Sequence, residues 1–95
     1  MIERYIAKVP VSAASAMAKG TILEYDATNN KYVALASGEP AGVLMEDVVQ
    51  GQNPAYAKVL FHGIVYLDEL TNTPDIDVVA KLRKIGVFVE ERTEA

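Results

Sequence analysis

The chain has 95 residues, of which 51% are hydrophobic and 23% charged, and its net charge is −4. This composition is typical of one globular domain and not of a disordered chain. The negative charge argues against nucleic acid as the main partner, because such binding depends on clustered Lys and Arg. The sequence contains no cysteine, which excludes disulfides, thiolate metal sites and cysteine nucleophiles.

Apolar residues are dispersed along the chain. No apolar run approaches the roughly 20 residues of a membrane-spanning helix. The first segment carries Glu3, Arg4 and Lys8, whereas a secretory signal needs a continuous apolar stretch. We therefore expect a soluble protein with no membrane partner.

Residues 1–9 alternate imperfectly between apolar and polar side chains. Because neither face of this segment is purely apolar, the pattern predicts an edge strand or an arm. Pro10 lacks a backbone donor, so we expect regular pairing to stop there. Residues 12–18 are small and predict a surface crossing or a single turn.

Residues 20–47 read as three strands. The first contains Leu23 and Tyr25, and residues 26–30 favour a loop of four or five residues. Residues 31–35 form the return strand. After a corner at residues 37–40, a third strand is expected over residues 41–49, and a polar loop over residues 50–54.

The clearest strand pattern covers residues 57–67. One face is entirely apolar, and the opposite face is amphipathic rather than polar. The pattern predicts either a central strand of a closed sheet or a strand whose second face is covered by another subunit. Gly63 predicts a bend or a bulge in it.

One helix is expected near the C-terminus. Thr73 is the expected N-cap and Pro74 the first helical residue, and Gly86 should end the helix. Its apolar stripe would contain Ile76, Val79 and Leu82. A short strand follows over residues 87–89, and the charged end of the chain is expected to fray.

Together these elements predict a single mainly β domain with one short helix. We divide the chain into an N-terminal arm or lead-in (residues 1–19), a β-rich core (residues 20–90) and a frayed tail (residues 91–95).

No catalytic, cofactor-binding or metal-binding residues are predicted. His62 has no second His or Cys to share a metal, so a packed or interface imidazole is expected. Neighbouring carboxylates do not converge on a strand, nor do those two apart on a helix. Strand-end and cap roles are therefore expected for the acidic pairs Glu46–Asp47, Asp68–Glu69 and Asp75/Asp77. The basic trio Lys81, Arg83 and Lys84 predicts a solvated helix face. Ser12, Ser15 and Ser37 lack the context of a nucleophile elbow, and Gly38 and Gly42 do not form a phosphate loop.

The chain resembles the lambda-type phage head decoration proteins over residues 14–89. The resemblance rests on the order of local segments, none of which is a strong motif alone. These are Ala16-Met17-Ala18-Lys19-Gly20, the LxYDxxxNKYVAL hairpin of Leu23 to Leu35, Pro40-Ala41-Gly42-Val43-Leu44, Phe61-His62-Gly63, Tyr66-Leu67-Asp68-Glu69-Leu70, and a short helix that closes on Gly86 before a final β segment.

The resemblance implies a β-clip-like small barrel or bent ribbon and a structural role without enzymatic activity. Proteins of this family form homotrimers on three-fold sites of an expanded icosahedral head, on the outer surface of the virion. There they bind the major capsid protein and stabilise the shell against internal DNA pressure. The implied assembly site is the host cytoplasm.

The family's N-terminal segment adds a strand to the capsid protein's sheet. In this chain, whose lead is shorter than in the best-known pattern, the corresponding residues are Ile2, Glu3, Arg4, Tyr5, Ile6, Ala7, Lys8 and Val9. Such strand addition is physically reasonable, because main-chain groups supply affinity and alternate side chains set the register.

Two other functions remain open from the residues alone. A small ligand- or glycan-binding β-domain would need exposed aromatic side chains, and a biotin-type or lipoyl-type carrier would need a lysine at a hairpin tip, which Met45-Glu46-Asp47 does not offer. A carboxylate-dependent hydrolase would need acidic side chains that converge in a pocket.

Overall fold

The computed structural model describes residues 3–36 and 38–91. Ile2, Ser37 and residues 92–95, which include most of the predicted tail, lie outside this part. The elements in chain order are β1 (Tyr5–Pro10), β2 (Ile22–Asp26), β3 (Lys31–Ala34), β4 (Pro40–Leu44), β5 (Tyr56–Tyr66), the 3-10 helix η1 (Leu67–Glu69), α1 (Ile76–Lys84) and β6 (Val87–Glu90).

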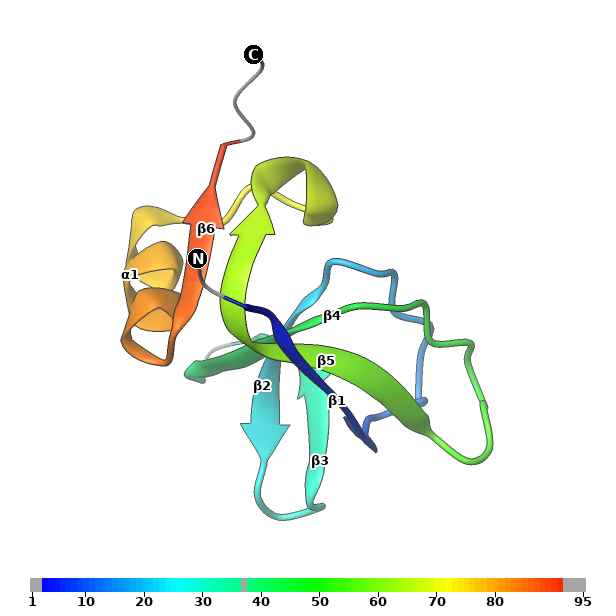
Figure 1. The fold of residues 1–95 in the computed structure, drawn as a ribbon. Helices are drawn as coiled ribbons and strands as arrows, with labels where there is room; N and C mark the ends of the chain where they lie inside the picture. Colours follow the sequence, from blue (N-terminus) through cyan, green and yellow to red (C-terminus); the bar gives the residue numbers. More distant parts are fainter. Residues whose placement is uncertain (1–2, 37, 92–95) are drawn as a thin grey trace.

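Antiparallel pairs join the first five strands in the order β1-β5-β4-β2-β3. The two outer strands of this sheet meet just after β1, where Val11 forms a bridge with Tyr32 and the Ser12 N–H donates to the Tyr32 carbonyl at 2.8 Å. The sheet therefore curves into a small barrel (Figure 1). This confirms the expectation of a mainly β domain with one short α-helix.

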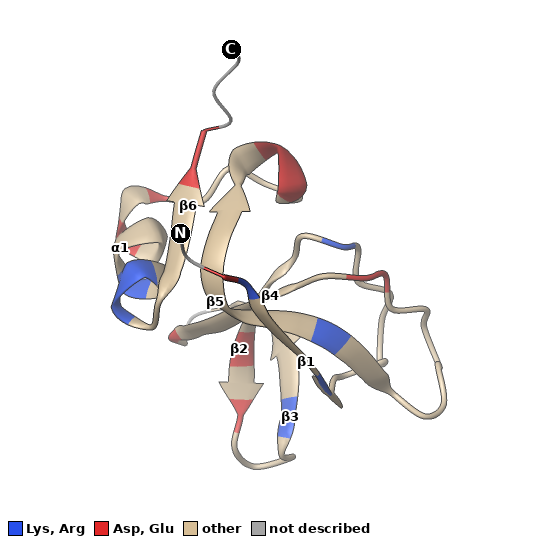
Figure 2. Cartoon of the chain, in the orientation of Figure 1, with Lys and Arg blue, Asp and Glu red and all other residues tan. Residues whose placement is uncertain are grey.

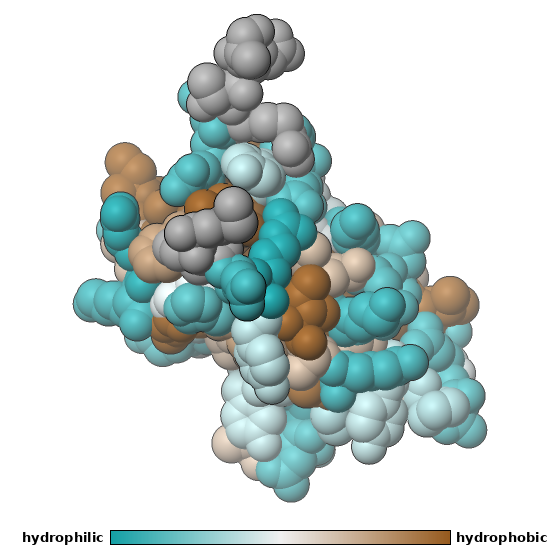
Figure 3. Space-filling model, viewed as in Figure 1, coloured by the Kyte–Doolittle hydropathy of each residue, from teal (hydrophilic) through white to brown (hydrophobic). Residues whose placement is uncertain are grey.

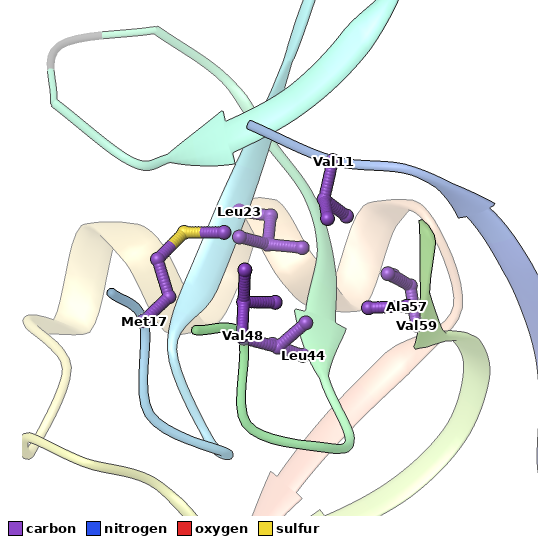
Figure 4. Packing of buried hydrophobic residues seen from close by; sticks show 7 residues of the cluster. All are labelled: Val11, Met17, Leu23, Leu44, Val48, Ala57 and Val59. Atoms are coloured by element: carbon purple, nitrogen blue, oxygen red, sulfur yellow. The ribbon is translucent and has the colours of Figure 1, made fainter. Parts of the chain in front are cut away.

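The inside of the barrel holds the first hydrophobic core. Figure 4 shows its side chains pointing toward one another from the strands and from the segments between them; they are Val11, Met17, Leu23, Leu44, Val48, Ala57 and Val59. Val11 and Met17 are 1% and 8% exposed, although both fall in the predicted lead-in. Residue 19 is therefore not a structural boundary, because the preceding segment supplies part of the core.

A second core lies on the opposite face of β4 and β5. Successive side chains of a strand point to opposite faces of the sheet. The side chains of Leu44 and Val59 therefore point into the barrel, and those of Val43 and Leu60 point outward. There they pack with Val65, Leu82 and Val87, from the end of β5, from α1 and from β6. On the amphipathic face predicted for β5, this second core covers Leu60, whereas Lys58 and His62 are exposed.

The second half of β5 bends away from the barrel and pairs in parallel with β6. The bend contains Gly63, whose φ of +120° few other residues adopt. Gly86 ends α1 with a φ of +95° and donates its backbone N–H to the Arg83 carbonyl. Both glycines do what the sequence predicts for them.

Two predicted boundaries are wrong. The third strand starts at Pro40 and ends at Leu44 instead of reaching residue 49, because its polar end bonds to other segments. The helix begins at Ile76 with Asp75 as its N-cap, two residues later than expected. Ile76 is 86% exposed and therefore does not belong to the buried stripe, whose anchor is Leu82.

Candidate interaction surface

Residues 5–9 of the predicted capsid-binding segment lie in the edge strand β1, and Ile2 is outside the described residues. Its register places Lys8 opposite Lys58 and Ala7 opposite Val59. Glu3 and Arg4 precede the strand. The segment is therefore held within this chain's own sheet instead of projecting as a separate arm.

The backbone of Lys8 points away from β5. Val11 donates to the Ala55 carbonyl at 2.9 Å, and hydrogen-bonded positions alternate along an antiparallel pair, so Ala7 and Val9 face β5 and Lys8 does not. Lys58 agrees with this assignment, because its own backbone groups bond toward β4. Before Val11 the outer edge of β1 therefore offers main-chain groups to a further strand.

Arg4 fastens the start of this segment to the far half of β5. Its Nε donates to the Ile64 carbonyl at 3.0 Å, and its guanidinium pairs with the Glu69 carboxylate. The same Glu69 oxygen accepts the Tyr66 N–H at 3.0 Å. Arg4 thus connects the N-terminal segment to the η1 turn.

One side of the β1–β5 pair is open to solvent. We call it the outer face, and it consists of Ile6, Lys8, Pro10, Tyr56 and Lys58. All five side chains are exposed, with exposed fractions of 40% for Ile6 and 46% for Tyr56. Figure 2 shows the blue lysine positions on these two strands.

Four aromatic rings form a row across the barrel. The ring centroids are 6.3 Å apart for Tyr5 and Phe61, 5.4 Å for Phe61 and Tyr32, and 5.0 Å for Tyr32 and Tyr25. The outer members Tyr5 and Tyr25 are 61% and 47% exposed, while the two inner rings are half-buried. Burial raises the pKa of Tyr32 above its ordinary value. The row is an aromatic surface with a rigid centre.

His62 is an exposed residue on β5, and its ring lies against Gly86, where an added Cβ would lie 2.4 Å from His62 Cδ2. The imidazole thus packs against the turn before β6. Its expected alternative role at a subunit interface stays a prediction.

The predicted acidic pairs stabilise turns. Glu46 accepts the backbone N–H of Lys58 and Asp47 that of Lys19, both at 2.7 Å. The two carboxylates therefore serve different segments of the chain. Glu69 pairs with Arg4, and its neighbour Asp68 lies beside it in η1.

The basic trio lies in the last turn of α1. Lys81 pairs with Glu39 at 3.6 Å, and the Arg83 guanidinium lies 5.6 Å from the centre of the Phe88 ring. Lys84 is exposed. These contacts agree with a solvated helix face.

Asp26 organises the hairpin loop between β2 and β3, which has the predicted four residues. Its carboxylate accepts the backbone N–H groups of Thr28 and Asn29 and the Asn29 side-chain amide at 2.7 Å. These hydrogen bonds, the side-chain one most of all, hold the pKa of Asp26 below its ordinary value of 3.8.

An open groove of about 360 Å³ lies between the barrel and the loop that precedes α1. Its walls combine apolar side chains such as Ile22 and Leu35 with the hydroxyl and amide groups of residues 71–73, and Asp75 is its charged residue. In the described part of the chain, no His, Asp and Glu side chains gather in a group that would hold a metal ion.

Ser12 accepts the Ala14 N–H in a local turn, and Ser37 lies outside the described residues. Gly42 is buried where a Cβ would lie 2.7 Å from a Val59 methyl group, so close strand packing explains this glycine. Of the helices formed by residues 3–36 and 38–91, none is long and apolar enough to cross a membrane.

No protein-family model matches this chain, and no curated protein matches it.

Sequence reasoning predicted an edge strand in the N-terminal segment but did not predict the outer face or the aromatic row. Both depend on strand register, which places residues about 50 positions apart side by side, as for Lys8 and Lys58. No pattern within one segment carries this information. The exposure of Ile76 could have been predicted locally, because its two sequence neighbours, Asp75 and Asp77, are charged residues that favour the protein surface.

Proposed function

We propose that this chain is a structural protein of a phage virion, a trimeric decoration protein that binds three-fold sites on an expanded icosahedral head. Its partners would be the major capsid protein and two further copies of itself. The role is attachment without catalysis, on the outer surface of the shell. The proposal rests on the resemblance described above and on the geometry of β1.

The observation that carries the proposal is the open outer edge of β1. Lys8 directs its backbone donor and acceptor away from β5, and Tyr5 and Ile6 expose large apolar side chains beside it. An extended capsid segment can add to such an edge as a further strand. Pro10 limits the available edge, because proline has no N–H to donate.

This geometry changes the expected mechanism of attachment. A free arm would lose about 1–2 kcal/mol of backbone entropy for each residue that becomes ordered. Here residues 5–10 are already ordered by pairing with β5. The preceding residue, Arg4, is held by its hydrogen bond to the Ile64 carbonyl. Three such edges in one trimer would then bind together, and effective concentration would strengthen a weak individual contact.

Lys8→Pro tests the proposed edge. The substitution removes an N–H that points outward and leaves the bonds between β1 and β5 in place. At about 1 kcal/mol for each lost hydrogen bond, three copies should bind expanded, undecorated heads roughly a hundredfold more weakly. Co-sedimentation with the heads measures this effect, and undiminished binding would exclude the β1 edge as the attachment site.

Ala7→Pro is the matched control. Its N–H faces β5, so the substitution should lower the melting temperature, whereas Lys8→Pro should change it much less. Deletion of residues 1–9 is a poorer test, because it would remove pairing that the barrel needs.

The aromatic row favours a second candidate function, the binding of a glycan. Sugar rings stack on aromatic faces, and Tyr5 and Tyr25 expose theirs at the two ends of the row. Tyr25→Ala should abolish binding to any sugar found on a glycan array, whereas attachment through the β1 edge should survive this substitution. An array without any bound sugar would remove this candidate.

A further inference from the structure

Two lysine side chains lie opposite each other on the outer face. Lys8 and Lys58 form a non-hydrogen-bonded pair, the position in an antiparallel sheet where side chains approach most closely. Like charges in this arrangement destabilise the sheet. Among residues 3–36 and 38–91, neither lysine has an ion-pair partner. In a chain of net charge −4, the pair is therefore a local basic site able to attract carboxylates from another molecule.

Exposed apolar groups flank this basic site. Ile6 and Tyr56 belong to the same face and are 40% and 46% exposed. Figure 3 shows that hydrophobic patches on this view of the molecule are set among hydrophilic side chains. A suitable partner therefore combines negative charges with an apolar side chain.

The first turn of α1 has this chemistry. Ile76 is 86% exposed and stands between Asp75 and Asp77, which are exposed as well. We call these three residues the acidic turn. Asp75 is the N-cap of α1 and has an extended backbone, and its side chain makes no capping hydrogen bond. Within the described residues neither aspartate forms an ion pair, so both charges remain available.

We propose that the outer face of one copy of this chain binds the acidic turn of a second copy. The Asp77 carboxylate would pair with Lys8 and Lys58, and Ile76 would pack against Tyr56. Asp75, which does not face the same way as Asp77, adds negative charge beside them. The partner is assigned by complementarity of charge and apolarity between two surfaces of the same chain. Charged groups of this kind fix the register of an interface more than they supply its affinity.

One chain does not bring these two surfaces together. The longest extent of the molecule is 41 Å. Figure 1 shows α1 beside β6 and the second half of β5, whereas the β1–β5 pair runs from there along the barrel. The contact is heterologous, and each copy of a bound pair keeps one unused surface: the acidic turn of the first copy and the outer face of the second. Such a contact closes into a ring when its rotation permits. The inference rests on the proposed trimer and identifies the surfaces that build it.

Reversal of the lysine pair tests the contact. In the Lys8→Glu/Lys58→Glu variant, two like charges still lie opposite each other, so the repulsion within the chain is conserved. The attraction between this pair and the acidic turn of a second copy becomes repulsion. Self-association should weaken on the order of tenfold or more, as measured by light scattering or analytical ultracentrifugation. Unchanged self-association would overturn the proposal, and so would a wild-type chain that stays monomeric at every concentration measured.

A complementary variant makes the test specific. Asp75→Asn/Asp77→Lys keeps a good N-cap residue and reverses the charge of the acidic turn. Alone it should self-associate as poorly as the lysine variant, and an equimolar mixture of the two should recover association as mixed dimers. A ring of three would still contain one repulsive contact between two copies of the same variant. Circular dichroism verifies that both variants fold. A mixture without recovery would contradict the pairing.

Lys19→Glu/Lys84→Glu is the matched control, because it changes the net charge by the same amount at exposed positions outside the outer face. Its self-association should stay close to that of the wild type, and an equal loss would show that net charge alone is responsible. Binding to expanded heads is measured separately. If the wild type fails to bind heads but the charge-swap result holds, the decoration function is wrong and the self-contact stands. If the wild type binds heads but charge reversal does not change self-association, only this inference fails.

Discussion

The barrel and the helix-bearing end of the molecule use the same two strands but are closed in different ways. The barrel is closed by main-chain bonding, since the chain after β1 meets β3 at Val11 and Tyr32. The other end is closed by side chains, because α1 and β6 cover Leu60 and Val65 without extending the barrel. One long strand, β5, passes through both regions.

The difference explains the unusual pattern of β5. Where Val59 faces the barrel and Leu60 faces α1, adjacent positions are both 0% exposed. Closer to the start of the strand none of the described residues covers the outer side, and Tyr56 and Lys58 are exposed there. The second core therefore accounts for the burial of Leu60, and the start of β5 stays exposed.

The largest expected effects come from the cores. Leu82→Ala should lower the free energy of unfolding by about 2–5 kcal/mol, and Leu23→Ala in the barrel by a similar amount. Because β4 and β5 contribute to both cores, each variant should unfold in one cooperative transition. Denaturant unfolding followed by tyrosine fluorescence and by far-UV circular dichroism tests this. Separate transitions for Leu82→Ala would show that the helix-bearing end unfolds independently of the barrel.

The substitution Gly20→Ala tests the close contact between the segment before β2 and the η1 turn. Gly20 has a φ of +96°, and an added Cβ would lie 2.2 Å from the Glu69 carbonyl oxygen. The combination of left-handed backbone and overpacking should cost about 3 kcal/mol. Thermal unfolding measures this cost, with Gly51→Ala as control, since that glycine also has a positive φ but open space around it. Equal losses for both variants would show that the close contact with η1 contributes nothing.

Ile76→Ser should have almost no effect on stability, within about 0.5 kcal/mol, because the side chain is 86% exposed. Denaturant unfolding, followed as for Leu82→Ala, measures this change in the free energy of unfolding. A loss comparable to that of Leu82→Ala would restore Ile76 to the buried stripe and remove the acidic turn from the surface.

A small effect that depends on pH is expected for Asp26, in the hairpin loop between β2 and β3. Its pKa is lowered in the folded chain, so its contribution to stability is present above its ordinary value of 3.8 and is lost as the pH falls through the folded pKa. Asp26→Asn should therefore be less stable than the wild type near neutral pH, with the difference vanishing in strong acid. An NMR titration that gives Asp26 a pKa of 3.8 or higher would contradict the loop geometry.

Local patterns predicted much of the fold. The alternation of residues 57–67, the polar residues of the β2–β3 loop, and Gly63 and Gly86 each determine structure within a few neighbours. The start of α1 was missed because Thr73 and Asp75 are both acceptable N-caps and packing decides between them. The core positions of Val11 and Met17 were missed because small residues around them give no periodic signal.

The candidate surfaces were harder to predict, because they depend on contacts between distant segments. The sequence indicates that residues 1–9 are an edge, and the structure adds which of its backbone groups point outward. The pairing of Lys8 with Lys58 follows from register alone, and register emerges only when the whole sheet is assembled.

The most direct test of the central claim is to mix the purified wild-type chain with expanded heads that lack decoration protein and to image the particles by cryo-electron microscopy. Our account predicts three copies around each three-fold site, with β1 beside a strand of the capsid protein. Heads that remain bare at saturating protein would contradict it.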